Sequence, residues 1–146
     1  SNEILEYAQN NNAECVVISA AIEAEISQLT SIEERQEFLD TLGLETSGLD
    51  KLIQSGYRLL NLLTFFTAGP KEARAWTAPF GAKAPKAAGV IHTDFKKKFI
   101  RAETVTHEDF IKYKGFNECK NAGKLRLEGK DYSVNDGDVM YFRVGS

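Results

Sequence analysis

Apolar residues in the first part of the chain recur every three or four positions along four stretches. This spacing places them on one face of a helix, so helices are predicted over residues 3–11, 21–29, 31–42 and 49–62. Ser31 followed by Glu34 matches a capping box at the start of the third helix. Between the first two helices, Cys15–Ile18 is a continuous apolar run, typical of a strand buried on both faces of a parallel sheet.

A single strand of this kind cannot form a sheet alone, because its N–H and C=O groups need neighbouring strands. Residues 1–62 are therefore predicted to be the tail of a larger α/β domain whose other strands lie upstream. The apolar surface of Cys15–Ile18 and its helices should then pack on the second half of the chain, on a second copy or on upstream residues.

The spacing changes after residue 62, where apolar and polar residues often alternate. Strands are predicted over Glu72–Phe80, Phe99–Val105 and Val139–Val144, with a hairpin around Gly129 that joins residues 124–127 to 132–134. Helices are predicted over Pro85–Lys98, broken by Gly89, and over Glu108–Tyr113. Strands and helices interleaved in this way predict an α+β domain with a mixed sheet.

The charge of the chain reverses near the same boundary. Residues 1–62 contain eleven Asp or Glu and three Lys or Arg, a net charge of −8, whereas residues 63–146 contain ten and fifteen, a net charge of +5. An acidic half joined to a basic half indicates two units with different partners. The basic half is the one suited to an anionic polymer.

Composition narrows the class of protein. A 42% apolar and 27% charged chain is globular. No apolar run approaches the roughly 20 residues that span a bilayer, and the start of the chain does not resemble a signal peptide, so we expect a cytoplasmic protein without a membrane partner. Two lone cysteines make neither a disulfide framework nor a metal-ligand spacing.

The block from Phe65 to Glu103 carries the best candidate site. It contains all three prolines, the single Trp and a group of basic residues. Each cation that neutralises a phosphate releases counterions, so these basic residues are candidate RNA contacts: Lys83, Lys86, Lys96, Lys97, Lys98 and Arg101. Trp76 and Phe80 are candidates for stacking on bases. The alternative is an ordinary solvated face with Trp76 in the core.

The remaining reactive residues favour structural roles. His92-Thr93-Asp94 is either a ligand contact or a helix cap, and the cap is favoured. His92 and His107 lack carboxylates at helical spacing, so no metal site is expected. Cys15 is placed in the buried strand and Cys119 in a polar turn, without the His partner of a nucleophile. No catalytic residue is predicted.

Two long segments carry a resemblance to a known family. They are TAGPKEARAWTAPFGAKAPKAAGVIHTDFKKKFIRAE and, later, AGKLRLEGKDYSVNDGDVMYF. Both closely resemble the C-terminal part of the YchF/Obg-like ATPase family, and the resemblance covers nearly the whole chain. It implies that residues 61–146 are a TGS domain, which has a β-grasp (ubiquitin-like) fold. Residues 1–60 would then be the helical C-terminal remnant of a P-loop NTPase α/β domain, the family's G domain.

The resemblance also implies a function. Family members bind and hydrolyse ATP, some also GTP, with magnesium, and associate with ribosomes. Ser19 and Ala20 match the family's last base-contacting motif. The TGS domain would be a regulatory module that binds the ribosome, rRNA or tRNA. Where the family normally has Glu-Lys-Gly, this chain has Lys96-Lys97-Lys98, which adds positive charge.

The motifs of nucleotide hydrolysis are missing from these residues. No GxxxxGK[ST] phosphate loop occurs, so there is neither a backbone cradle for phosphates nor a Lys for the terminal phosphoryl group. The chain alone is therefore expected to bind no cofactor and to hydrolyse no nucleotide. Two further hypotheses stay open: a protein–protein interaction module of the same NTPase without nucleic-acid contact, and the enzyme itself.

Overall fold

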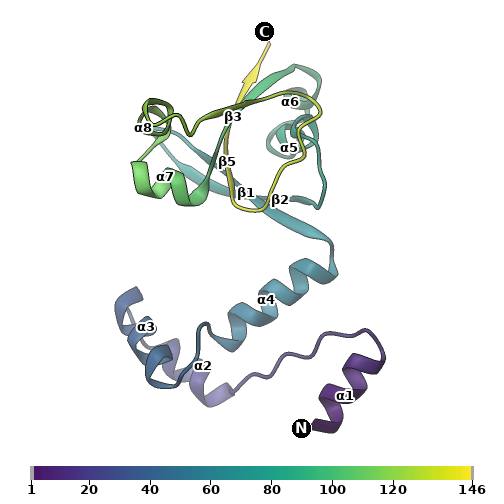
Figure 1. Ribbon diagram of the computed structural model, residues 1–146, viewed down its shortest axis with the longest axis vertical. Helices are drawn as coiled ribbons and strands as arrows, with labels where there is room; N and C mark the ends of the chain where they lie inside the picture. Colours follow the sequence, from purple (N-terminus) through teal and green to yellow (C-terminus); the bar gives the residue numbers. More distant parts are fainter. Residues whose placement is uncertain (1, 146) are drawn as a thin grey trace. The chain divides into compact units, whose positions relative to one another are not determined.

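The computed structural model of the protein describes residues 2–145, which divide into two compact units at the bond between Leu60 and Asn61 (Figure 1). The first unit is helical, with α1 (Asn2–Asn10), α2 (Ala20–Ile26), α3 (Ile32–Thr41) and α4 (Gly48–Leu59). The last three begin at serine caps, Ser19, Ser31 and Ser47, whose side-chain oxygens each accept a backbone N–H three residues on. The predicted capping box of Ser31 and Glu34 is confirmed.

The predicted strand Cys15–Ile18 is wrong. These residues are extended but pair with no strand in the part of the chain that the structure describes. Cys15 is exposed and not buried, and Val17 is 72% exposed. An apolar run becomes a buried strand only where neighbouring strands satisfy its backbone groups, and residues 2–60 contain no strand that could do so.

The second unit is built on a mixed five-stranded sheet, as predicted for an α+β domain. Its strands are β1 (Leu62–Ala68), β2 (Ala73–Pro79), β3 (Phe99–Thr106), β4 (Arg126–Glu128) and β5 (Asp138–Val144), in the order β2-β1-β5-β3-β4. The central pair β1–β5 is parallel and the other neighbours are antiparallel. β2 and β4 are the two edges of the sheet.

Helices pack on both faces of this sheet (Figure 1). On one face, α5 (Ala84–Ile91) and α6 (Thr93–Lys97) cover Leu63, Phe65 and Met140. Three fully buried alanines of α5, at positions 84, 87 and 88, let the helix approach the sheet closely. On the other face, α7 (His107–Tyr113) and α8 (Phe116–Asn121) pack over Val105 and Val139.

Two boundaries in the middle of the chain differ from the prediction. The helix predicted to reach residue 62 ends at Leu59, because Asn61 adopts a left-handed conformation (φ 54°) that turns the chain into β1, a strand that the sequence analysis did not predict. The helical stretch Pro85–Lys98 is interrupted at His92 and not at Gly89. Gly89 lies inside α5, where a Cβ atom would come within 3.0 Å of the Lys96 Cβ atom.

The C-terminal third corrects two further predictions. The predicted hairpin around Gly129 does not form; β4 pairs with β3, and Ser133 makes only an isolated bridge to Lys83. Cys119 lies not in a polar turn but fully buried in α8, a helix that the sequence analysis missed, and burial raises the pKa of its thiol. Among residues 2–145, no helix is both long enough and apolar enough to cross a membrane.

Candidate functional site

Ser19 and Ala20, the predicted nucleotide contacts, lie at the start of α2. The Ser19 hydroxyl oxygen accepts the Ile22 N–H at 3.5 Å, and both residues are exposed. The Glu23 carboxylate, one turn later, accepts the Gly48 N–H at 2.8 Å. Gly48 fits tightly there, since a Cβ atom would lie 3.0 Å from Glu23 Oε1. The segment that carries Ser19 is therefore fixed against the start of α4.

The other end of the same extended segment is held by Glu14. Its carboxylate accepts hydrogen bonds from Arg58 Nε and Nη2, each at 2.9 Å, and from the Ser55 hydroxyl. Arg58 and Ser55, the two residues that donate to Glu14, both belong to α4. The hydrogen bonds from Arg58 and then Ser55 hold the pKa of Glu14 at about 2, against an ordinary value of 4.5.

This contact predicts an acid-dependent stability of the helical unit. Because the pKa of Glu14 is lowered in the folded state, its contribution is fully present above pH 4.5 and is lost as the pH falls towards about 2. We expect Glu14→Gln to destabilise the helices at neutral pH, with the difference from the wild type vanishing over that window. Urea unfolding followed by circular dichroism at several pH values measures it.

The control for this prediction is Glu6→Gln, which removes an exposed carboxylate that contacts no cation among residues 2–145. A Glu14→Gln difference that stays constant from neutral pH to pH 2 would contradict the assignment.

The predicted basic cluster is divided in the structure. Arg101 lies opposite Arg143 in the β3–β5 register, two positions along the strands from the Glu103–Tyr141 pair. Its side chain therefore shares the sheet face of Glu103 and Tyr141, which is opposite the face that α5 covers. The five lysines belong to the helical side, on α5, α6 and their flanking residues. One continuous surface of all six residues is not formed.

Among the five lysines, Lys83 differs from the others. Its ammonium donates to the Asp131 carbonyl oxygen and to the Ser133 hydroxyl, both at 2.8 Å. It thereby ties the loop before β5 to the start of α5. The other four are exposed, and their ammonium groups make no hydrogen bond or ion pair to any residue that the structure describes: Lys86, Lys96, Lys97 and Lys98. We call these four residues the lysine surface.

The aromatic residues predicted to stack on bases have other surroundings. Trp76 is half-buried against the core, its indole N–H donates to the Thr67 hydroxyl at 2.9 Å, and the Arg74 guanidinium lies 4.3 Å from its ring centre. Phe80 is exposed. A cap in His92-Thr93-Asp94 is confirmed, but the capping residue is His92 and not the expected Thr93 or Asp94: its Nδ1 atom accepts the Asp94 N–H at 3.2 Å at the start of α6.

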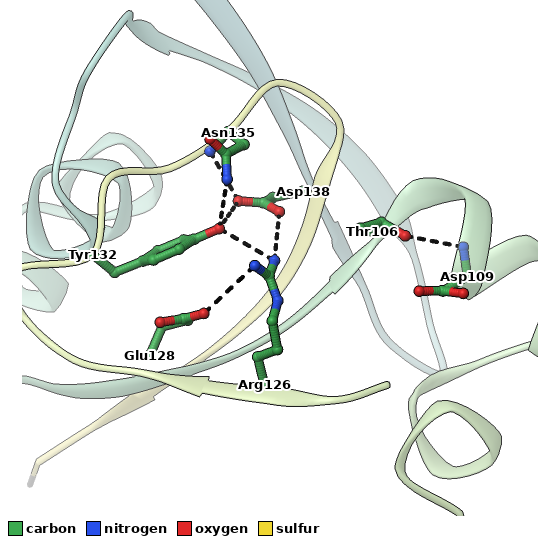
Figure 2. A network of polar contacts seen from close by, with 7 residues as sticks. All are labelled: Thr106, Asp109, Arg126, Glu128, Tyr132, Asn135 and Asp138. Carbon is green, nitrogen blue, oxygen red and sulfur yellow. Dashed lines mark hydrogen bonds and ion pairs between the residues drawn. The ribbon is translucent and has the colours of Figure 1, made fainter. Parts of the chain in front are cut away.

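A polar network that the sequence analysis missed closes the loop between β4 and β5 (Figure 2). At its centre is Asp138, only 3% exposed. Its carboxylate accepts the Tyr132 hydroxyl at 2.7 Å, the Asn135 N–H at 2.9 Å and Arg126 Nη2 at 3.1 Å. Burial, followed by the hydrogen bond to Asp138, raises the pKa of Tyr132 to about 12.

The network supports the start of α5, where Lys83 lies. It fixes the same loop whose Asp131 carbonyl and Ser133 hydroxyl hold Lys83. In the sequence, the run Asn135-Asp136-Gly137-Asp138 is typical of a turn; the sign of a further role is an Asp at the first position of a strand whose next four residues are apolar or aromatic. Within residues 2–145, no group of three or more His, Cys, Asp or Glu is arranged to hold a metal ion.

Comparisons with known proteins give a consistent match. The YchF-GTPase_C family, described as "Protein of unknown function (DUF933)", matches residues 62–145. The proteins called ribosome-binding ATPase YchF in Haemophilus ducreyi and Pasteurella multocida are each 58% identical over 142 residues, 97% of this chain and 39% of the relative. The structure of the Schizosaccharomyces pombe YchF GTPase matches with a TM-score of 0.77 and 38% identity, over 97% of this chain and 38% of that one. The chain thus spans about two fifths of the length of these relatives.

Proposed function

Because this chain belongs to the YchF family, we propose that it is the C-terminal part of a ribosome-associated nucleotide-binding protein, and that residues 61–146 contact ribosomal RNA. Two relatives carry the name ribosome-binding ATPase. One observation in this chain carries the RNA contact: the lysine surface is exposed and lacks a protein partner among the described residues, in a half with net charge +5. Unpaired lysines on a basic unit are suited to phosphates.

The two units take different parts in this proposal. Residues 61–146 are a TGS domain of the β-grasp type, supported by the mixed sheet with a parallel central pair and α5 packed across it. Residues 1–60 are the end of the G domain, supported by their exposed apolar side chains, which a longer chain would cover. A ribosomal partner would place the protein in the cytoplasm.

In the parent protein, Ser19 and Ala20 would contact the base of ATP or GTP, with magnesium bound elsewhere in the G domain. The exposed start of α2, held in place by Glu14 and Glu23, fits a base contact. The described residues offer no phosphate loop and no acidic cluster for magnesium. When bound, the nucleotide would supply the free energy for a conformational change of the parent protein. This chain would contribute only the residues that contact the base, Ser19 and Ala20.

The RNA contact is tested by titrating the chain with deproteinised ribosomal RNA at several salt concentrations. Four phosphate contacts predict a slope of log affinity against log salt of about −3, so the affinity should fall roughly 60-fold between about 50 mM and 200 mM salt. Absence of binding at the lower salt concentration, or binding without a salt slope, would contradict the proposal. Intact ribosomes should bind with the same salt dependence.

A protein–protein contact is the second candidate function. A hollow of about 550 Å³ with a largely apolar lining opens beside β1, with Trp76, Ile91, Phe95 and Phe142 in its wall. A pull-down that survives nuclease treatment and is unaffected by changes in the lysine surface would favour this alternative.

Self-association through exposed leucines of α4, such as Leu52 and Leu59, would appear as dimers in sedimentation.

A further inference from the structure

The sheet face opposite α5 holds a second hollow, of about 400 Å³, between β5 and the turn that joins α7 to α8. Tyr141 and Arg143 project into it from alternate positions of β5, and Glu103 lines it from β3. The Arg143 guanidinium lies 4.4 Å from the centre of the Tyr141 ring, and its Nε atom donates to Glu103 Oε1 at 2.9 Å. The hydrogen bond to Glu103 thus holds the Arg143 guanidinium over the Tyr141 ring.

This stack is accessible from solvent. Tyr141 is 43% exposed, and its ring meets the edge of Phe116 with centroids 6.5 Å apart. Two exposed cations flank the hollow, Lys114 at its rim and Arg101 opposite Arg143 on β3. Neither side chain makes a hydrogen bond or ion pair to another residue within 2–145. Exposed aromatic and guanidinium planes beside unpaired cations are the elements of a single-stranded nucleic-acid site.

We propose that this hollow takes one unpaired base of the RNA, stacked against the exposed part of the Tyr141 ring beside Arg143, with the adjoining phosphates at Arg101 and Lys114. The orientation follows from charge. The carboxylates of Glu103 and Glu118 line the hollow, so a phosphate inside it would be repelled, whereas a base amino group could donate to them. The site should therefore favour bases with an exocyclic amine over uracil.

This inference rests on the proposed RNA contact but uses a different face of the sheet. The lysine surface lies on the α5–α6 side and would bind phosphates of any sequence. The hollow would add a contact to one base. An RNA strand bound at both places would have to pass an edge of the sheet, and the short strand β4 is the edge next to Arg101.

The test uses a uridine oligonucleotide with one central 2-aminopurine, whose fluorescence falls on stacking. The wild-type chain should quench it, and Tyr141→Leu should abolish the quenching and weaken binding roughly 10-fold, within the range for one stacked base. Tyr141→Phe keeps the ring and should behave as wild type. Tyr7→Leu is the matched control, because Tyr7 is an exposed tyrosine of the helical unit. Thermal unfolding of each variant checks that it folds.

The outcomes separate this inference from the proposed function. Quenching that disappears in Tyr141→Leu and remains in Tyr141→Phe and Tyr7→Leu supports a base site in the hollow. A wild-type chain that binds the oligonucleotide without quenching, or a Tyr141→Leu variant equal to wild type, overturns the hollow and leaves the lysine surface standing. A chain that binds neither this oligonucleotide nor ribosomal RNA overturns both. A further outcome is that the wild-type chain does not quench the 2-aminopurine but binds ribosomes through a contact that resists nuclease, and that Tyr141→Leu loses this contact. That result would assign the hollow to a protein partner and overturn the base site.

Discussion

Replacing Lys96, Lys97 and Lys98 together by glutamine is expected to weaken binding to ribosomal RNA roughly 100- to 1,000-fold at low salt. The three ammonium groups are exposed and make no protein contact among the described residues, so their charge is available to phosphates. Each phosphate contact contributes about −0.7 to the salt slope, so the loss of three of the four contacts should reduce the slope from about −3 to about −0.7, the contribution that Lys86 retains. Filter binding at several salt concentrations measures both quantities.

A matched control separates the surface from net charge. Lys120, Lys124 and Lys130 are exposed lysines of the same unit, outside α5 and α6, and their replacement by glutamine removes the same three charges. We expect this control to lose much less affinity than the Lys96–Lys98 variant. Equal losses in the two variants would show that only the overall charge attracts RNA, and the assignment to α5–α6 would be wrong.

Replacing Asp138 by alanine is expected to lower the free energy of unfolding of the second unit by about 3 kcal/mol, near the lower end for a broken buried ion pair because Arg126 is partly exposed. The change leaves Tyr132, the Asn135 N–H and Arg126 without their shared acceptor. For a domain of this size, the melting temperature should fall by roughly 10 to 20 °C. Calorimetry measures the change.

The control for Asp138 is Asp131→Ala. Asp131 lies in the same loop, and its backbone carbonyl, which holds Lys83, is retained in the variant. A spectroscopic titration of tyrosine gives a second readout, since the pKa of Tyr132 should fall from about 12 once the Asp138 carboxylate is gone, while burial of the ring keeps it raised. If Asp138→Ala left both the free energy of unfolding and the raised pKa of Tyr132 unchanged, the central place of Asp138 in the network would be contradicted.

Local spacing was sufficient where an element depends on its own residues. The caps at Ser31 and within His92-Thr93-Asp94 and the strands near Phe99 and Val139 depend on side chains close in sequence, and their positions follow from the chain itself. The α+β class followed for the same reason. The family resemblance added the expected partners, which spacing alone does not contain.

Elements that depend on distant residues could not be predicted in this way. Cys15–Ile18 has the composition of a strand, yet it has no strand beside it among the described residues. β4 pairs with β3 and not with Tyr132–Val134, which is nearer in sequence. This pairing depends on residues of the sheet that are distant from β4 in sequence. The same holds for the candidate site. Arg101 is close to Lys98 in sequence, but the β-bulge between Phe99 and Arg101 helps to place it on the opposite face.

The central claim is that the lysine surface binds RNA, and nuclear magnetic resonance tests it most directly. The isotope-labelled chain, 146 residues long, would be titrated with a single-stranded uridine oligonucleotide of about 12 nucleotides, within the span of one basic groove. We expect backbone amide shifts to concentrate in residues 84–98 and to vanish in the Lys96–Lys98 glutamine variant. Shifts confined to residues 2–60, or shifts that persist unchanged in that variant, would contradict the claim.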